Sequence, residues 1–142
     1  MEAYRYAMTT ELTVLAWACL LAIVHLWLPI RAKTRQYGIK WNMGPRDEAQ
    51  DAAGPMAGRL ERAQANYYES FPLIAAAILI VSVADLETRW TAIGAILWLG
   101  ARILYLPLYA FGVPGLRSIV WTASVVGLIM VLWPALAAAF QA

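Results

Sequence analysis

The chain has 142 residues, of which 62% are hydrophobic and only 14% are charged. A soluble domain has roughly 45 to 50% apolar and about 25% charged residues, so this composition indicates that a lipid bilayer is the solvent. The formal net charge is +2, and the sequence provides no basic face of the kind that binds DNA or RNA. We therefore expect membrane lipids as partners and no nucleic acid.

Four apolar stretches are long enough to cross a bilayer, which needs about 20 apolar residues per helix. They predict helices at about 10–30, 58–83, 90–111 and 116–140, within a single transmembrane domain that covers residues 1–142. The first stretch is longer than the roughly 7 to 15 residues of a signal-peptide core, so we interpret it as a retained helix. The predicted fold class is an all-α integral membrane four-helix bundle.

The only sizeable connection is the polar segment 31–57, which carries glycines, prolines and charges of both signs and predicts a loop. Within it, residues 44–48 are interpreted as a turn with solvated charges. Most Lys and Arg residues fall on the side of the first and third connections. By the positive-inside rule these two connections face the cytoplasm and both termini lie opposite, across the inner membrane if the protein is bacterial.

Polar side chains inside apolar spans are costly and are therefore functional candidates. One set shares a face of the predicted second helix, at spacings of three and four residues: Arg59, Arg62, Asn66 and Glu69. A second set has the same spacing on the third helix: Arg102, Tyr105 and Tyr109. Arginines bind carboxylates through two charge-assisted bonds, so the two stripes favour a site for an anionic ligand. They are equally compatible with polar pairing that holds an oligomer together.

Four other residues are weaker candidates. His25 has apolar neighbours and no second His or Cys to share a metal, so helix packing is favoured and no metal site is expected. Cys19 lies in an apolar run, where a desolvated thiol is inert. Tyr67 and Tyr68 are consecutive, so at most one of them can share the stripe of Asn66 and Glu69.

The segment Arg62-Ala-Gln-Ala-Asn-Tyr-Tyr-Glu-Ser-Phe-Pro72 resembles the signature of the MAPEG family, the membrane-associated proteins in eicosanoid and glutathione metabolism. The pair Ala101-Arg102 with Tyr105 and Tyr109 resembles the third helix of that family, and residues 116–118 resemble the start of its fourth. The segments 38–41 and 44–48 resemble a bacterial branch. The resemblance covers nearly the whole chain.

The resemblance implies a homotrimer that binds glutathione between neighbouring subunits near the cytoplasmic face. Seven residues match glutathione-contacting positions: Arg31, Arg62, Gln64, Asn66, Glu69, Tyr105 and Tyr109. Arg117 matches the arginine that stabilises the glutathione thiolate and would be catalytic. An ordinary role for Arg117 is also open, because arginines at helix boundaries often extend to lipid phosphates.

The expected activity is that of a glutathione-dependent transferase or peroxidase, acting on a lipophilic small molecule that arrives from the bilayer. Two departures from the family pattern bear on the substrate: Gly58 stands where many members have Glu, and Ser70 where others have an aromatic residue. Two alternatives stay open. One is a non-enzymatic MAPEG-fold protein that binds a lipid or an anionic small molecule, and the other is an assembly subunit in which the stripes serve only helix association.

Overall fold

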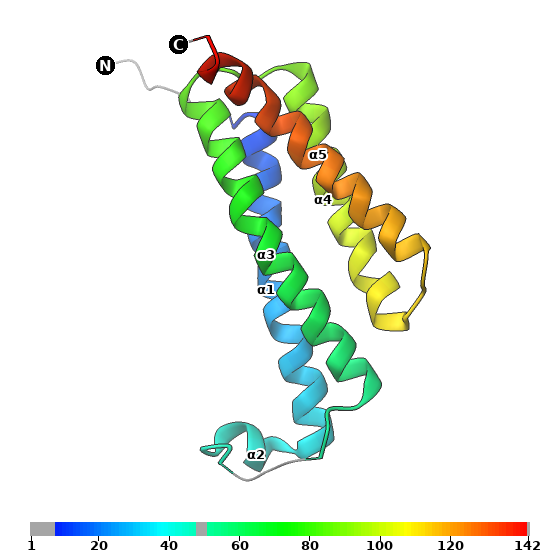
Figure 1. Ribbon diagram of the computed structural model, residues 1–142. Helices are drawn as coiled ribbons and strands as arrows, with labels where there is room; N and C mark the ends of the chain where they lie inside the picture. Colours follow the sequence, from blue (N-terminus) through cyan, green and yellow to red (C-terminus); the bar gives the residue numbers. More distant parts are fainter. Residues whose placement is uncertain (1–7, 48–50, 142) are drawn as a thin grey trace, which may run out of the picture.

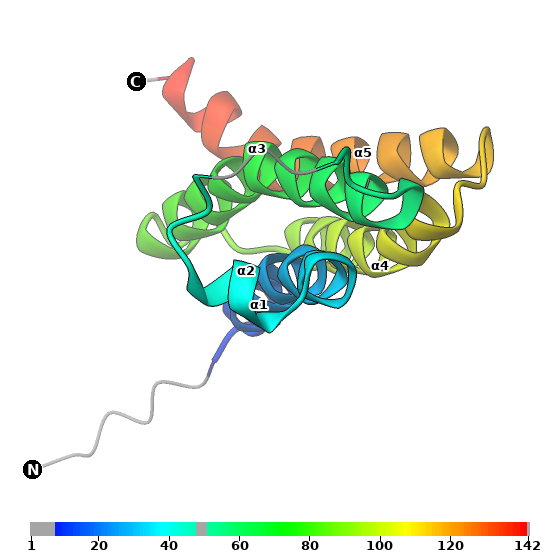
Figure 2. The ribbon, with the colours of Figure 1, turned by 90° about the horizontal axis from the view of Figure 1, so that it is seen from below.

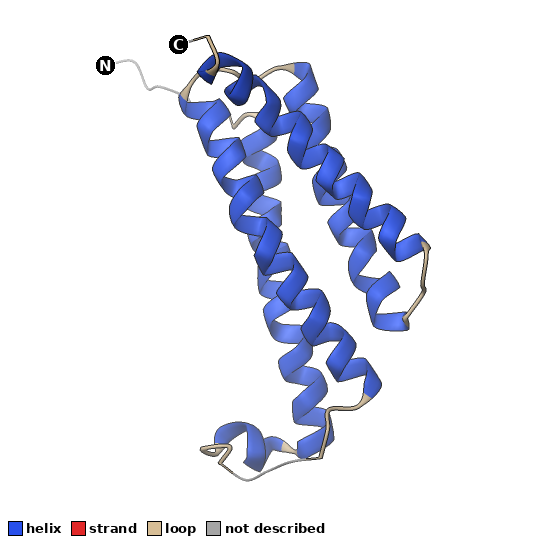
Figure 3. Ribbon diagram, viewed as in Figure 1, coloured by secondary structure: helices blue, strands red, loops and turns tan. Residues whose placement is uncertain are grey.

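The computed structural model describes residues 8–47 and 51–141. It contains five helices: α1 (Thr10–Tyr37), α2 (Ile39–Met43), α3 (Pro55–Val83), α4 (Arg89–Phe111) and α5 (Leu116–Ala139). All the regular structure of the described residues is helical (Figure 3). The four long helices are apolar and long enough to cross a membrane. The predicted all-α membrane bundle is confirmed, and the chain is a multi-pass integral membrane protein.

The four long helices run side by side as two antiparallel pairs, α1 with α3 and α4 with α5 (Figure 1). The start of α1, the α3–α4 turn and the end of α5 lie at one end of the bundle. The segment between α1 and α3 and the α4–α5 turn lie toward the other end, which we call the basic end because it carries Arg31, Lys33, Arg35 and Arg117. Seen from that end, α3 and α5 form one layer and α1 and α4 the other (Figure 2).

Helix α1 continues to Tyr37, seven residues beyond the Ile30 at which the apolar pattern of the sequence ends. Residues 31–37 are mostly good helix formers, so the helix leaves the apolar span without a break. It stops at Gly38, whose φ of 89° lies in the region that glycine favours. The predicted loop 31–57 therefore begins with helix and also contains the short helix α2. The change from apolar to charged residues after Ile30 therefore does not mark the end of the helix.

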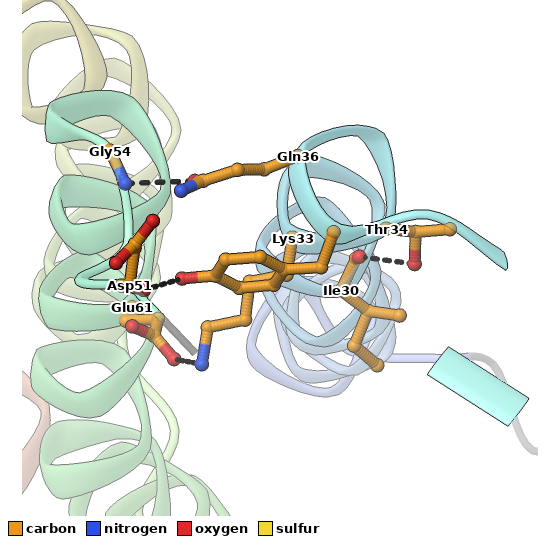
Figure 4. A network of polar contacts seen from close by, with 8 residues as sticks. Ile30, Lys33, Thr34, Gln36, Asp51, Gly54 and Glu61 are labelled. Carbon is orange, nitrogen blue, oxygen red and sulfur yellow. Dashed lines mark hydrogen bonds and ion pairs between the residues drawn. The ribbon is translucent and has the colours of Figure 1, made fainter. Parts of the chain in front are cut away.

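Polar contacts tie the extended end of α1 to the residues that lead into α3 (Figure 4). They are an ion pair between Lys33 and Glu61, a bond from the Gly54 amide to Gln36 Oε1 (2.8 Å) and a bond from the Tyr37 hydroxyl to the Asp51 carbonyl (2.7 Å). Each of these groups is partly or fully exposed, so each contact is individually weak. Together they hold the first turns of α3 beside α1 at the basic end.

Two glycines allow α4 and α5 to pack backbone against backbone. A Cβ added to Gly94 would lie 2.6 Å from the Met130 Cβ and 2.8 Å from the Gly127 carbonyl oxygen. A Cβ added to Gly127 would lie 2.6 Å from the Gly94 oxygen and 2.7 Å from the Trp98 nitrogen. Inside a bilayer the hydrophobic effect does not drive helices together, so close packing of small residues is a main source of their association.

We expect Gly127→Ala to destabilise the protein by about 1–3 kcal/mol, because the new methyl group meets backbone atoms that cannot move independently of their helix. Gly100→Ala is the matched control, since nothing lies within 4 Å of a Cβ at that helical position. Thermal unfolding in mild detergent measures the difference. Equal stability of the two variants would show that the α4–α5 contact contributes little.

Candidate functional site

Arg102, on α4, is buried inside the bundle with 2% of its surface exposed. Its Nη1 donates a 2.7 Å hydrogen bond to Oδ1 of Asn66, which α3 presents from the facing helix. This contact joins the polar stripe predicted on α3 to the polar stripe predicted on α4. A charge-assisted bond of this kind is shorter and stronger than a neutral one.

The rest of the Arg102 guanidinium lies among aromatic rings. Its central carbon is 5.8 Å from the centre of the Trp98 ring and 5.6 Å from that of Tyr105. Aromatic faces attract cations, which offsets part of the cost of burial. The Nε atom is buried and has no hydrogen-bond partner among the described residues. A buried donor without a partner calls for an acceptor, which a water molecule, a ligand or a neighbouring chain would supply.

Tyr105 and Tyr109 continue from Arg102 toward the basic end, one helical turn apart on α4. Their ring centres are 5.4 Å apart, and the Arg117 guanidinium carbon, on the first turn of α5, is 4.5 Å from the centre of the Tyr109 ring. We call Arg102, Tyr105, Tyr109 and Arg117 the arginine–tyrosine ladder. It places two cations and two phenol groups in a continuous row that leads from the bundle core to the α4–α5 turn.

The remaining candidates on α3 make no side-chain hydrogen bond or ion pair with another described residue. Arg62 and Glu69 are exposed and Gln64 is half-buried. Arg62 and Glu69 stand one turn to either side of Asn66, on the same face of the helix. Asn66 thus contacts the ladder, whereas Arg62 and Glu69 on either side of it have no partner within residues 8–47 and 51–141.

Arg31 lies elsewhere, near the end of the apolar part of α1. Its guanidinium carbon is 4.7 Å from the centre of the Trp27 ring. It lines a groove of about 420 Å³ between α1 and α3, together with Leu28 and Leu60. Within one chain the structure does not bring Arg31 to the ladder.

His25 and the two consecutive tyrosines serve the contact between α1 and α3. The buried His25 ring stacks on Tyr67 at a centroid distance of 4.4 Å, and neither of its nitrogens has a hydrogen-bond partner among the described residues. The Tyr67 hydroxyl donates to the Ala18 carbonyl at 2.6 Å, and the Tyr68 hydroxyl donates to the Ala22 carbonyl at 3.0 Å. Both tyrosines therefore point to α1, so neither belongs to the stripe that meets the ladder.

Arg59 holds the end of α4 in place. Its Nη1 donates to the Ala110 carbonyl at 3.4 Å, and its guanidinium lies directly over Gly112. Gly112 ends α4 in the left-handed conformation, with φ of 72°. A cation at a helix C-terminus is favourable because the last carbonyl groups carry partial negative charge. Arg59 on α3 thus fixes the turn that precedes α5, whose second residue is Arg117.

We expect Gly112→Ala to destabilise the turn between α4 and α5. Gly112 is left-handed, with φ of 72° and ψ of 35°, so an alanine there is strained by about 1–2 kcal/mol. The new methyl group also displaces the Arg59 guanidinium, which adds about 0.3–1 kcal/mol. Thermal unfolding and hydrogen exchange of residues 108–116 measure the effect.

A double-variant cycle isolates the Arg59 contribution. Adding Arg59→Gln to Gly112→Ala should change stability little, because the contact is already lost, whereas Arg59→Gln alone should weaken the turn. Additive effects of the two substitutions would contradict the contact.

The fold and the ladder define a polytopic helical membrane protein with a row of cations and phenols embedded between three of its helices. The family model described as the MAPEG family matches residues 14–137. The chain therefore belongs to the MAPEG family, as its signature segment indicated, and this family includes glutathione transferases and related proteins. A search of curated protein sequences found no match.

Sequence reasoning placed Arg102 on the third-helix stripe but left it out of the expected glutathione contacts. Its signal was present, since a charge in the middle of an apolar span must find a partner inside the protein. The role of Arg59 had no such signal. Position 59 lies at the polar start of a helix, where charge is ordinary, and only the packing of α3 against α4 brings its guanidinium to Gly112.

Proposed function

We propose that the protein is a membrane-embedded, glutathione-dependent transferase or peroxidase that acts on lipophilic electrophiles. The observation that carries the proposal is the arginine–tyrosine ladder, in which Arg102 is buried with a free Nε and Arg117 is held over Tyr109. Family membership supports the same class of activity.

The residues at the site suit glutathione, a tripeptide with two carboxylates, one ammonium group and one thiol. Guanidinium groups bind carboxylates, and Arg62 and Arg102 lie on the two helices that meet at Asn66. The exposed Glu69 carboxylate can accept hydrogen bonds from the ammonium group. Gln64, Tyr105 and Tyr109 add neutral donors and acceptors, and Arg31 adds a further cation.

Arg117 would activate the thiol. Only the thiolate is nucleophilic, and a free thiol with a pKa of roughly 8.5 is mostly protonated at neutral pH. A fixed cation beside the sulfur lowers that pKa and keeps the sulfur ionised. The sulfur then bonds to the electrophilic carbon, and the leaving group departs with the bonding electron pair. The electrophile reaches the sulfur from the acyl region, so no polar pocket is needed for it.

We expect Arg117→Ala to raise the pKa of the bound thiol and to reduce conjugation at neutral pH, with a smaller effect on glutathione affinity because the carboxylate anchors lie elsewhere. Raising the pH should restore part of the rate, since hydroxide then ionises the thiol without the arginine. A pH series of thiolate absorbance and conjugation rate tests this, with Arg89→Ala at the opposite end of the bundle as the control. Indistinguishable pH profiles for wild type and Arg117→Ala would remove Arg117 from the mechanism.

We further propose that the protein works as a homotrimer, with the basic end and the first and third connections in the cytoplasm. The excess of Lys and Arg at that end supports the orientation. If the protein is bacterial, the membrane would be the inner membrane. The unpartnered side chains on α3 support the oligomer. Arg62 and Glu69 would be costly to leave facing lipid, whereas a neighbouring subunit can supply polar partners. A glutathione site between two subunits would use them in this way.

We expect Asn66→Ala and Glu69→Gln to weaken trimer assembly and glutathione binding together. Asn66→Ala leaves the buried Arg102 guanidinium without its hydrogen bond, which costs about 1–3 kcal/mol. Native mass spectrometry in mild detergent measures the oligomer, and titration calorimetry measures glutathione binding. Tight glutathione binding by a monomer would contradict an intersubunit site, and intact trimers with normal binding in both variants would show that this α3 face is dispensable.

The main alternative is a MAPEG-fold protein that has the same site but binds a lipid or an anionic small molecule without turnover. A panel of hydrophobic electrophiles and hydroperoxides, assayed with and without glutathione, separates the two. Conjugation or hydroperoxide reduction that depends on glutathione supports the enzyme, and glutathione binding without thiolate absorbance or turnover supports the binding protein.

A further inference from the structure

A groove of about 580 Å³ lies outside the bundle, in the angle between α1 and α2. Its lining includes Trp27, Ile30, Arg35 and Ile39. Figure 4 shows that Ile30 and Thr34, which also line it, point away from α3, whereas Lys33 and Gln36 point toward it. The groove is therefore open on the outer side of α1 and separate from the arginine–tyrosine ladder.

Two arginines edge this groove at the level where the apolar span ends. Arg31 and Arg35 are one helical turn apart, and both are exposed. The stacking of Arg31 on Trp27 holds its guanidinium at the membrane boundary, where tryptophan rings prefer to lie. The one ion pair within residues 8–47 and 51–141 is Lys33–Glu61, so neither arginine is neutralised by the described part of the chain.

Apolar side chains extend from the two arginines in both directions along the surface. Ile23, Trp27 and Ile30 form an exposed stripe along α1, at spacings of four and three residues. On α2, which turns sideways from the end of α1 (Figure 1), Ile39 and Met43 are 68% and 82% exposed and one turn apart. Such residues are unfavourable in water and stable at the boundary between headgroups and acyl chains.

We propose that this groove binds one anionic phospholipid, with its phosphate between Arg31 and Arg35 and an acyl chain along Ile30, Trp27 and Ile23. Charge complementarity selects this occupant. A guanidinium makes paired charge-assisted bonds to phosphate oxygens, and two unneutralised cations favour a headgroup with net negative charge over a zwitterionic one. The apolar stripe accounts for the chain of the same molecule. The site goes beyond the proposed function and does not depend on glutathione.

Arg35 is the residue to vary, because Arg31 belongs to the proposed glutathione contacts. The full-length protein in mild detergent, without glutathione, would be titrated with phosphatidylglycerol and phosphatidylcholine of identical acyl chains, and native mass spectrometry would count the lipids retained per protomer. We expect preferential retention of one phosphatidylglycerol. Arg35→Gln should weaken it by about fivefold or more, and Arg35→Lys should weaken it less.

Lys40→Gln is the matched control: it removes the same charge from α2 at the same end, at an exposed position that does not line the groove. It should retain phosphatidylglycerol as the wild type does. Equal retention of the two lipids by the wild type, or equal losses in Arg35→Gln and Lys40→Gln, would overturn the proposal. So would cross-links between copies from Thr34→Cys in a Cys19→Ser background, because they would place a second chain in the groove.

Discussion

The buried guanidinium of Arg102 constrains the whole bundle. A charge inside an apolar span is costly, and it is tolerated only where the protein replaces the water it has lost. Here the replacement comes from the Asn66 amide oxygen on α3 and from the ring faces of Trp98 and Tyr105 on α4. The register of α3 against α4 is therefore set by a polar contact, and a sliding of either helix by one turn would leave the charge unpaired.

The close packing of α4 and α5 extends this constraint to Arg117. The glycine pair lets the two backbones meet, so the rings on α4 and the first turn of α5 lie within reach of each other. Arg59 reaches across from α3 and holds the C-terminus of α4. Helices α3, α4 and α5 thus form one unit, in which contacts from α3 and α5 position the arginine–tyrosine ladder. The role proposed for Arg117 depends on such support, because small displacements of a cation weaken its effect on a neighbouring thiol.

The polar side chains of α3 find partners within the described chain on one face of the helix and not on the next. On the α1 side, Tyr67 and Tyr68 donate to α1 carbonyls and Lys33 pairs with Glu61. On the other face of α3, Arg62 and Glu69 have no partner among the described residues. This difference between the two faces of α3 supports the proposed ligand or neighbouring subunit, since unpaired polar groups in contact with lipid are destabilising.

Composition and the lengths of the apolar runs determined that the protein is a four-span helical membrane protein, because a bilayer constrains both strongly. The signature from Arg62 to Pro72 determined the family. The sequence also indicated that Asn66 and Arg102 lie on polar faces, since helical periodicity is a local property. Only the tertiary structure decided that they meet, that Arg117 lies over Tyr109 and that Arg59 holds Gly112. These contacts depend on the rotation and depth of each helix, which are set by how neighbouring helices pack and leave no local pattern in the chain.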